Sequence, residues 1–239
     1  LIDYLKNIFI FKKIIKKMIT FKKYLIPFVI IGSALGGFAT AEEKNGIYLT
    51  IGGGTNIILD TDWDETLSGV KYTGEVELDS KFSIDGGIGY DFGQWRTELT
   101  YQSFPTDLKS LSAEKVVGSV GVNATASGDV DIKSYFLTAY YDLPVYQIGN
   151  TKITPYIGAG IGSTNIDVDT ITVDSVSTGG GDDNATAYQL KFGSSFEMSK
   201  QSDLYIEGIY FSSGEFDILG TNFDPIKSLG VKSGIRFRF

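Results

Sequence analysis

The last eleven residues of the chain alternate strictly between two classes of residue. Apart from Ser233, one parity is apolar: Leu229, Val231, Ile235, Phe237 and Phe239. The other parity is glycine or basic: Gly230, Lys232, Gly234, Arg236 and Arg238. Successive side chains of a β-strand point to opposite faces, so the pattern predicts a strand with one apolar and one charged face. A soluble sandwich could hold such a strand, but it gains nothing from an aromatic final residue.

A second stretch, residues 76–92, divides in the same way over a greater length. Its apolar parity is Val76, Leu78, Phe82, Ile84, Ile88, Tyr90 and Phe92. Its polar parity is Glu75, Glu77, Asp79, Lys81, Asp85, Gly87, Gly89 and Asp91. A strand of about seventeen residues spans roughly 55 Å, which is more than an ordinary sandwich strand needs. We therefore predict a strand that crosses a bilayer obliquely, with lipid outside and a polar lumen inside.

Strand-like alternation occurs in eight segments altogether. They are residues 46–59, 76–92, 95–104, 129–142, 153–162, 185–198, 203–211 and 229–239. The orientation of the fourth is open, because aromatic residues occur on both of its parities. Long connections are expected at 60–74, 105–128, 167–184 and 212–226, with short or medium turns between them. This sorting predicts an all-β fold, an eight-stranded antiparallel up-and-down transmembrane β-barrel, which also leaves no unpaired edge in lipid.

Aromatic residues gather near the expected short turns, where an interfacial girdle should lie. They are Tyr90, Phe92, Trp95, Tyr140, Phe196, Phe237 and Phe239.

Three segments are similar to a known family. They are SYFLTAYYDL at 134–143, ITPYIGAGIG at 153–162 and VKSGIRFRF at 231–239. On these segments the chain resembles, from about residue 46 to 239, the eight-stranded OmpA-like, opacity-type outer-membrane proteins, including porin-family surface antigens of alphaproteobacteria. The resemblance implies a Gram-negative outer-membrane location and insertion by the barrel-assembly machinery. It also implies an assembly signal at Val231, Ile235, Phe237 and Phe239.

The amino-terminal part has the composition of a secretory leader. Six lysines within residues 12–23 precede an apolar run at 24–38, which ends in Ala39-Thr40-Ala41. These features predict a cleavable signal peptide over residues 1–41, with the barrel domain at 42–239. The alternative, a membrane-anchoring helix, needs a longer run. Residues 1–17 would be upstream read-in if Met18 is the true start.

Charge and residue content exclude several function classes. Without residues 1–41 the chain has 14 basic and 28 acidic residues, a net charge of −14 that repels nucleic acid. His and Cys are absent, so no Ser-His-Asp triad, Cys–His pair or His-bearing zinc site can form. We expect no enzyme activity and no cofactor. As an alternative to a solvated loop, Asp167, Asp169, Asp174 and residues 179–184 could hold Ca²⁺ through oxygen ligands.

The polar parities predict a network of charged side chains in the lumen. It comprises Glu75, Glu77, Asp79, Lys81, Asp85, Arg96, Glu98, Lys133, Lys191, Glu207, Lys232 and Arg236. Side chains just fill the interior of an eight-stranded barrel, so such a network would close it. The glycine-rich face of residues 153–162 leaves room for large side chains from elsewhere.

Two functions fit these expectations best. The first is a structural, surface-exposed barrel, an antigen or adhesin whose four long loops contact a host or environmental ligand. The second is a small porin or narrow channel for ions or small hydrophobic solutes. A soluble secreted β-sandwich or lipocalin-like binder is a third alternative. The first two require the outer-membrane lipid as a partner.

Overall fold

In the computed structural model every regular element described is a β-strand. The structure describes residues 45–59, 61–67, 70–79, 81–115, 121–124, 126–173, 176–218 and 221–239. Within them, no helix has the length and apolar character needed to cross a membrane. The expected signal peptide, with Ala39 and Ala41, lies outside the described residues.

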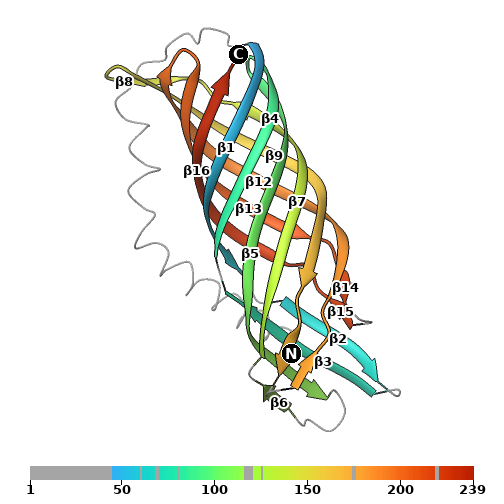
Figure 1. The fold of residues 1–239 in the computed structure, drawn as a ribbon. Coiled ribbons are helices and arrows are strands. Elements are labelled where there is room, and N and C mark those ends of the chain that lie inside the picture. Colours follow the sequence, from blue (N-terminus) through green and yellow to red (C-terminus); the bar gives the residue numbers. More distant parts are fainter. Residues whose placement is uncertain are drawn as a thin grey trace, which may run out of the picture.

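Eight long strands form a closed barrel. Around the ring they are β7 (Ala126–Asp142), β9 (Thr151–Val168), β12 (Gly181–Ser199), β13 (Ser202–Ser213), β16 (Lys227–Arg238), β1 (Asn45–Ile58), β4 (Phe82–Phe92) and β5 (Trp95–Lys115). Each strand pairs antiparallel with both neighbours, and β5 pairs with β7 to close the ring (Figure 1). The predicted all-β, eight-stranded antiparallel barrel is confirmed.

The closing strand β16 lies between β1 and β13. Its register with β1 runs from Ile58 opposite Ser228 to Tyr48 opposite Arg238. Phe237 faces outward and is exposed, whereas the side chains of Lys232 and Arg236 are buried inside. The two faces predicted from the alternation are therefore the outer and inner faces of the barrel wall.

One end of the barrel, which we call the turn end, has the shorter connections and the carboxyl terminus (Figure 1). Gly93 and Gln94 link β4 to β5, and Gly93 has a φ of 96°, a conformation that favours glycine. Its N–H donates to Asp91 Oδ1 at 2.9 Å. The medium connection at 143–150 contains β8 (Tyr146–Ile148), which pairs with β9.

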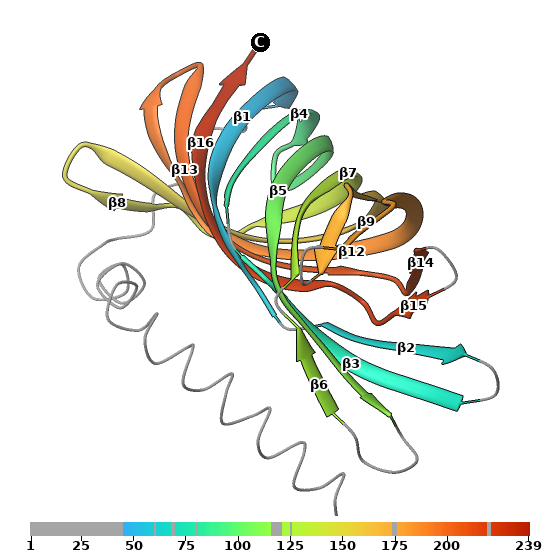
Figure 2. The same ribbon diagram turned by 60° about the horizontal axis from the view of Figure 1, so that its bottom comes forward.

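The opposite end, the loop end, contains further strands. They are β2 (Thr61–Leu67), β3 (Val70–Leu78), β6 (Gly121–Ala124), β10 (Ile171–Val173), β11 (Val176–Thr178), β14 (Phe216–Ile218) and β15 (Thr221–Phe223). The path β5–β3–β2–β15–β14 continues the sheet past the barrel (Figures 1 and 2). Long loops were expected here; instead, much of this chain is paired. The β5 ladder with β7 continues as far as Leu108 opposite Gly128, and beyond it β5 pairs with β3 and β6, which carries the strand to Lys115.

The single strand expected at residues 76–92 is wrong in its extent. β3 ends at Leu78 and β4 begins at Phe82. β4 pairs with β1 only as far as Phe82 opposite Thr55, while β3 pairs with β2 and with the end of β5. Between them, the N–H of Asp79 donates to the carbonyl of Asp107 at 2.8 Å. The chain thus changes partners at this polar break.

Two rows of outward-facing aromatic side chains ring the barrel. Near the turn end the row includes Tyr90, Phe92, Trp95, Tyr141 and Phe237, with Trp95 and Tyr141 ring centroids 4.8 Å apart. Nearer the loop end it includes Phe82, Tyr101, Tyr135, Tyr188 and Tyr210. Exposed aliphatic residues lie between the rows, as an apolar band with aromatic girdles requires.

Tyr140 was expected in the girdle but is wrong there. It is 3% exposed and lies inside the barrel, on the same parity of β7 as Ile132 and Phe136. The orientation of this strand, which the sequence left open, is thereby settled: the face with Val130, Ile132, Phe136 and Tyr140 points into the lumen.

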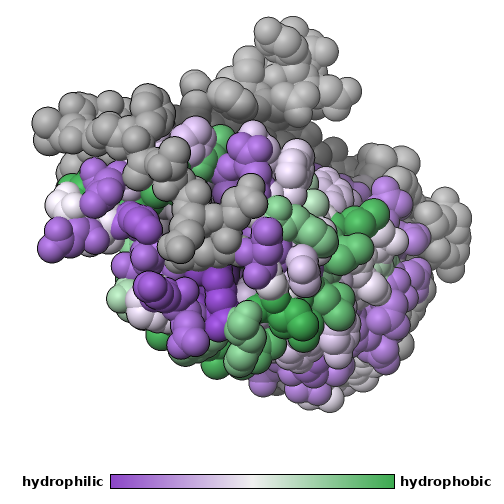
Figure 3. Space-filling view, turned by 90° about the horizontal axis from the view of Figure 1, so that it is seen from above, coloured by the Kyte–Doolittle hydropathy of each residue, from purple (hydrophilic) through white to green (hydrophobic). Residues whose placement is uncertain are grey.

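Seen from the turn end, hydrophobic residues cover a flank of the barrel and hydrophilic residues surround them (Figure 3).

Towards the loop end, the lumen is filled by apolar side chains that we call the apolar plug. It consists of Ile58, Phe104, Val130, Ile132, Phe136, Ile166, Ala185, Ala187, Phe211, Phe216, Ile218 and Ile226. β5 and β13 stand on opposite sides of the ring, yet the Phe104 and Phe211 ring centroids are 5.1 Å apart. Phe136 contacts Phe211 edge-on at 6.1 Å. Side chains from opposite walls therefore meet across the lumen.

Candidate functional site

Between the plug and the turn end, the lumen is lined by eleven charged side chains that we call the lumen charge cluster. Five are basic and six are acidic. The basic ones are Arg96, Lys191, Lys232, Arg236 and Arg238, and the acidic ones are Asp85, Asp91, Glu98, Asp142, Asp203 and Glu207. All occupy inward positions of β4, β5, β7, β12, β13 or β16.

Ion pairs link most of the cluster across strands that are neighbours or next but one in the ring. Arg96 donates from Nε and Nη2 to the two oxygens of Asp142, each at 2.8 Å. Such bidentate pairs are the strongest form of arginine–carboxylate contact. Lys232 Nζ lies 3.1 Å from Asp85 Oδ1 and also donates to Gln102 Oε1 at 3.0 Å.

Two arginines of β16 share carboxylates near the turn end. Arg236 Nη1 lies 3.6 Å from Asp203 Oδ2, and Arg238 also pairs with Asp203. Arg238 Nε lies 3.6 Å from Asp91 Oδ2 as well. The closing strand, whose backbone pairs with β13 and β1, is thus also tied to β13 and β4 by charge.

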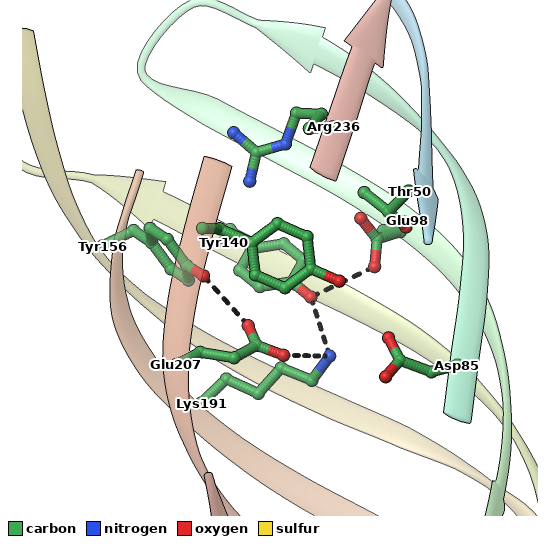
Figure 4. A pocket seen from close by; sticks show the side chains of 9 residues that line it. Thr50, Asp85, Glu98, Tyr140, Tyr156, Lys191, Glu207 and Arg236 are labelled. Carbon is green, nitrogen blue, oxygen red and sulfur yellow. Dashed lines mark hydrogen bonds and ion pairs between the residues drawn. The ribbon is translucent and has the colours of Figure 1, made fainter. Parts of the chain in front are cut away.

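Buried tyrosines connect the ion pairs into one network. Lys191 Nζ lies 3.2 Å from Glu207 Oε1 and donates to the Tyr140 hydroxyl at 3.2 Å. Tyr140 in turn donates to Glu98 Oε1 at 3.3 Å, and Tyr156 donates to Glu207 Oε2 at 3.0 Å (Figure 4). A network satisfied in this way lowers the cost of burying its charges.

Cation–π contacts hold Arg96 in place. Its guanidinium carbon lies 4.5 Å from the ring centroid of Tyr140 and 5.1 Å from that of Tyr156. Glycine provides the space for these rings, since a Cβ at Gly158 would lie 2.6 Å from Tyr140 Cδ1. The glycine-rich face of β9 therefore accommodates large side chains, as the sequence predicts.

The structure brings seven residues of the expected lumen network together. They are Asp85, Arg96, Glu98, Lys191, Glu207, Lys232 and Arg236. The other five lie elsewhere. Glu75 and Glu77 are exposed on β3, and Asp79 is at the break between β3 and β4. Lys81, just before the start of β4, and Lys133, at an outward position of β7, are part-exposed at the loop end.

Sequence reasoning missed other members of the site, notably Asp142, Asp203 and the tyrosines Tyr48, Tyr156 and Tyr205. The two aspartates could have been found from their parity in the strand. Asp142 ends β7 on the parity of Tyr140, and Asp203 is the second residue of β13 and lies on the parity of Glu207. Tyrosines at inward positions carried no such signal, because a tyrosine also suits the lipid interface.

A smaller charged group lies beyond the Tyr101–Tyr135 pair, outside the apolar band. Lys81 Nζ is 2.5 Å from Asp107 Oδ1 and 3.7 Å from Asp129 Oδ1. The hydrogen bond with Asp107 raises the pKa of Lys81 and lowers the pKa of Asp107. The pKa of Asp129 is raised, chiefly by its hydrogen bond with Asp107. The two carboxyls are directly opposite in the β5–β7 register.

The alternative calcium site falls only partly on the described residues. Asp167 of β9 lies opposite both Asp131 of β7 and Asp182 of β12. In the part of the chain that the structure describes, no group of three or more acidic side chains is suited to hold a metal ion. Asp174 lies outside that part.

The space left in the lumen charge cluster is small. A cavity of about 10 Å³ lies among Thr50, Asp85, Glu98, Tyr140, Tyr156, Lys191, Tyr205, Glu207 and Arg236 (Figure 4). Such a cavity holds about one water molecule.

Comparison with protein families gives a match over most of the barrel. A family model with the description "Surface antigen" matches residues 52–236. Outer membrane protein PagN of Salmonella typhimurium is 30% identical over 160 residues, which are 62% of this chain and 63% of that protein. The aligned part thus spans less than two thirds of the length of PagN.

Solved structures to which this chain is similar include the following two bacterial proteins. Neisserial surface protein A is 15% identical, with 81% of this chain and 97% of that chain covered and a TM-score of 0.48. The outer membrane protein OprG from Pseudomonas aeruginosa is 18% identical, with 82% and 98% covered and a TM-score of 0.49.

Proposed function

The chain belongs to the surface antigen family of Gram-negative outer-membrane β-barrels, and we propose that it is a closed barrel whose loop end contacts ligands outside the cell. In this role it is an antigen or adhesin-like protein held in the outer-membrane lipid. The turn end, with the carboxyl terminus, faces the periplasm. The ligand is a component of a host or environmental surface.

The observation that carries this proposal is the one-sided extension of the strands. About 9–11 residues suffice for a tilted strand to cross the membrane, whereas β5 has 21 residues and β12 has 19. The surplus lies past the aromatic row at the loop end, where β3, β2, β15 and β14 extend the sheet. Paired strands present side chains in fixed positions, which suits a binding surface better than an unpaired loop does.

The alternative, a small porin or channel, has less support. Two groups of buried side chains inside the barrel, the apolar plug and the lumen charge cluster, support a closed interior. A path for solutes would have to displace both. We therefore favour a closed lumen, in which the buried charges serve to hold the strands together.

The absence of His and Cys in the sequence also favours a non-catalytic role. Export and insertion are part of the proposal. We infer that residues 1–41 act as the signal peptide and that Val231, Ile235, Phe237 and Phe239 form the signal read by the barrel-assembly machinery.

The test is to remove part of the loop-end sheet and keep the barrel. Residues 61–78, which contain β2 and β3, would be replaced by a short Gly-Ser linker in bacteria that display the protein. We expect unchanged heat-modifiable gel mobility, the mark of a folded barrel, and loss of attachment to host cells or matrix-coated surfaces.

A matched control replaces residues 144–150 at the turn end with the same linker. This variant should keep both the gel mobility and the attachment. Attachment that survives removal of the loop-end sheet, or that is lost equally in the turn-end variant, would overturn the proposal.

A further inference from the structure

At the loop end the barrel wall has a seam at which two neighbouring strands form no ladder. β12 pairs with β13 only as far as Ala187 opposite Ser213, whereas its ladder with β9 continues to Gly181. Past Ser213 the chain forms β14, which pairs with β15 and ends the path of the loop-end sheet. Among the strands that the structure describes, none pairs with residues 181–186 of β12 on the side of β14. We call this place the β12–β14 seam.

A single carboxylate spans the seam. The N–H of Asp217 in β14 donates to Asp183 Oδ2 at 2.8 Å. The N–H of Asn184 in β12 donates to Oδ1 of the same side chain, also at 2.8 Å. Both donors are main-chain groups that a partner strand satisfies in a continuous ladder. The Asp183 side chain thus takes the place of main-chain acceptors between β12 and β14.

The strand that Asp183 holds covers the apolar plug. Phe216 and Ile218 of β14 are 7% and 6% exposed and belong to the plug. Phe216 stacks on Phe223 of β15 with ring centroids 5.2 Å apart. β14 and β15 lie together at the loop end of the barrel (Figures 1 and 2). We call these two strands the β14–β15 flap.

The flap is attached differently on its two sides. On one side β15 pairs with β2, with Phe223 opposite Trp63, and the sheet continues to β3 and β5. At the base of the flap, the N–H of Ser213 donates to the carbonyl of Ile226 at 2.9 Å. On the seam side, Asp183 stands in for a ladder. The seam is therefore the side on which the flap can lift without breaking strand pairing.

We propose that Asp183 is a latch that holds the β14–β15 flap against the rim of β12. When the latch is released, β14 lifts along the seam, stays joined to β2 through β15, and uncovers the plug. The apolar contacts of Phe216 and Ile218 favour the closed position but are not directional. Hydrogen bonds to a carboxylate are directional and stronger than neutral ones, so they fix the edge of the flap. This device holds whether or not the loop end binds a ligand.

The first test is thiol labelling of the full chain refolded into lipid vesicles. The sequence has no Cys, so Ile218→Cys introduces a single thiol that the closed flap buries. Adding Asp183→Ala should raise its labelling rate with a water-soluble maleimide by roughly tenfold or more, because hydrogen bonds to a charged acceptor are lost. Heat-modifiable gel mobility checks that each variant is folded.

The matched control for this labelling is Asp182→Ala. Asp182 is the exposed neighbour of Asp183, and its carboxylate accepts from Asn165 Nδ2 at 3.4 Å rather than from β14. Removing it takes away the same charge and should leave the labelling rate unchanged. An Asp183→Ala variant that labels at the wild-type rate, or an equal rise in Asp182→Ala, overturns the proposal.

Hydrogen exchange separates lifting of the flap from a general loss of stability. The N–H of Gly214 donates to the carbonyl of Thr186 across the seam and does not contact Asp183. Its exchange should nevertheless become roughly tenfold faster or more in Asp183→Ala, because lifting the flap breaks this bond. The N–H of Ser213, at the base, should exchange as in the wild type. Unchanged exchange at Gly214, or equal acceleration at Gly214 and Ser213, would rule out a latch.

Discussion

At the scale of single residues, the lumen depends on completed pairs. Burying an ion pair costs the hydration of both charges, and a close partner repays that cost only if the remaining hydrogen bonds are also made. In the pair of Lys232 with Asp85, Lys232 makes a further hydrogen bond to Gln102. Removing one partner leaves the other charge buried without a counter-charge. This lowers the stability of the fold far more than replacing both partners by apolar residues does.

Substituting Lys232→Met tests this dependence. The variant leaves Asp85 without its counter-charge, so we expect the free energy of unfolding to fall by about 3–5 kcal/mol. Urea unfolding in lipid vesicles, followed by tryptophan fluorescence, measures the change. Adding Asp85→Leu should restore much of the loss, because no lone charge then remains. Lys81→Met, which affects an exposed pair, should cost far less, because solvent screens such a pair. An equal loss in both single variants would contradict the argument.

The exposed group of Lys81, Asp107 and Asp129 at the loop end gives a prediction about pH dependence. Lys81 lowers the pKa of Asp107, so that contribution to stability is present at neutral pH and is lost as pH falls through the lowered pKa. Lys81→Met should raise the pKa of Asp107. Carboxyl-carbon NMR during a pH titration follows it, with Asp217 as a distant reference. An unchanged Asp107 titration would show that Lys81 does not act on it.

At the scale of elements, the sequence predicts the barrel strands well because alternation has a single physical cause. Each crossing segment separates lipid from lumen, so β4 and β16 show their two faces directly in the residue order. The strand extensions at the loop end cannot be predicted from alternation. Beyond the lipid, outward positions need not be apolar, and β5 continues past Pro105 because β7, β3 and β6 offer it partners. Such pairing depends on which segments lie side by side in the folded chain, and the residue order of one segment does not reveal this.

The terminal residue of the chain carries an element-scale prediction. Phe239 is 78% exposed on the outer surface, and its N–H donates to the carbonyl of Ile47 at 3.1 Å where β16 meets β1. Deleting Phe239 should slow insertion into the outer membrane while leaving export across the inner membrane intact. Pulse-chase labelling with heat-modifiable mobility separates the two steps. A Leu229→Ala variant on the same face serves as control, and normal assembly of the truncated chain would refute the proposed signal.

At the scale of the whole molecule, the lumen shows how far residue order can place a site. The alternation correctly placed Asp85, Lys191 and Arg236 in the lumen, because a charged side chain on a membrane-crossing strand avoids lipid and points inward. It also placed Glu75 and Lys133 in the lumen, where they do not lie, because parity does not reveal where along the barrel axis a strand leaves it. The apolar plug was not predicted, since an inward Phe136 looks like an outward one until its strand is oriented.

The two-layered interior predicts that the barrel does not conduct. In planar bilayers the wild-type protein should give no reproducible conductance steps. Replacing Phe136→Ser and Phe211→Ser opens the apolar plug but leaves the lumen charge cluster in place, so the membrane should stay as tight as with wild type. Phe82→Ser and Phe192→Ser, on the outer surface, control for effects of the substitutions on the bilayer. Regular steps from the wild type would establish a channel, and steps only from the plug variant would show that the plug alone keeps the lumen shut.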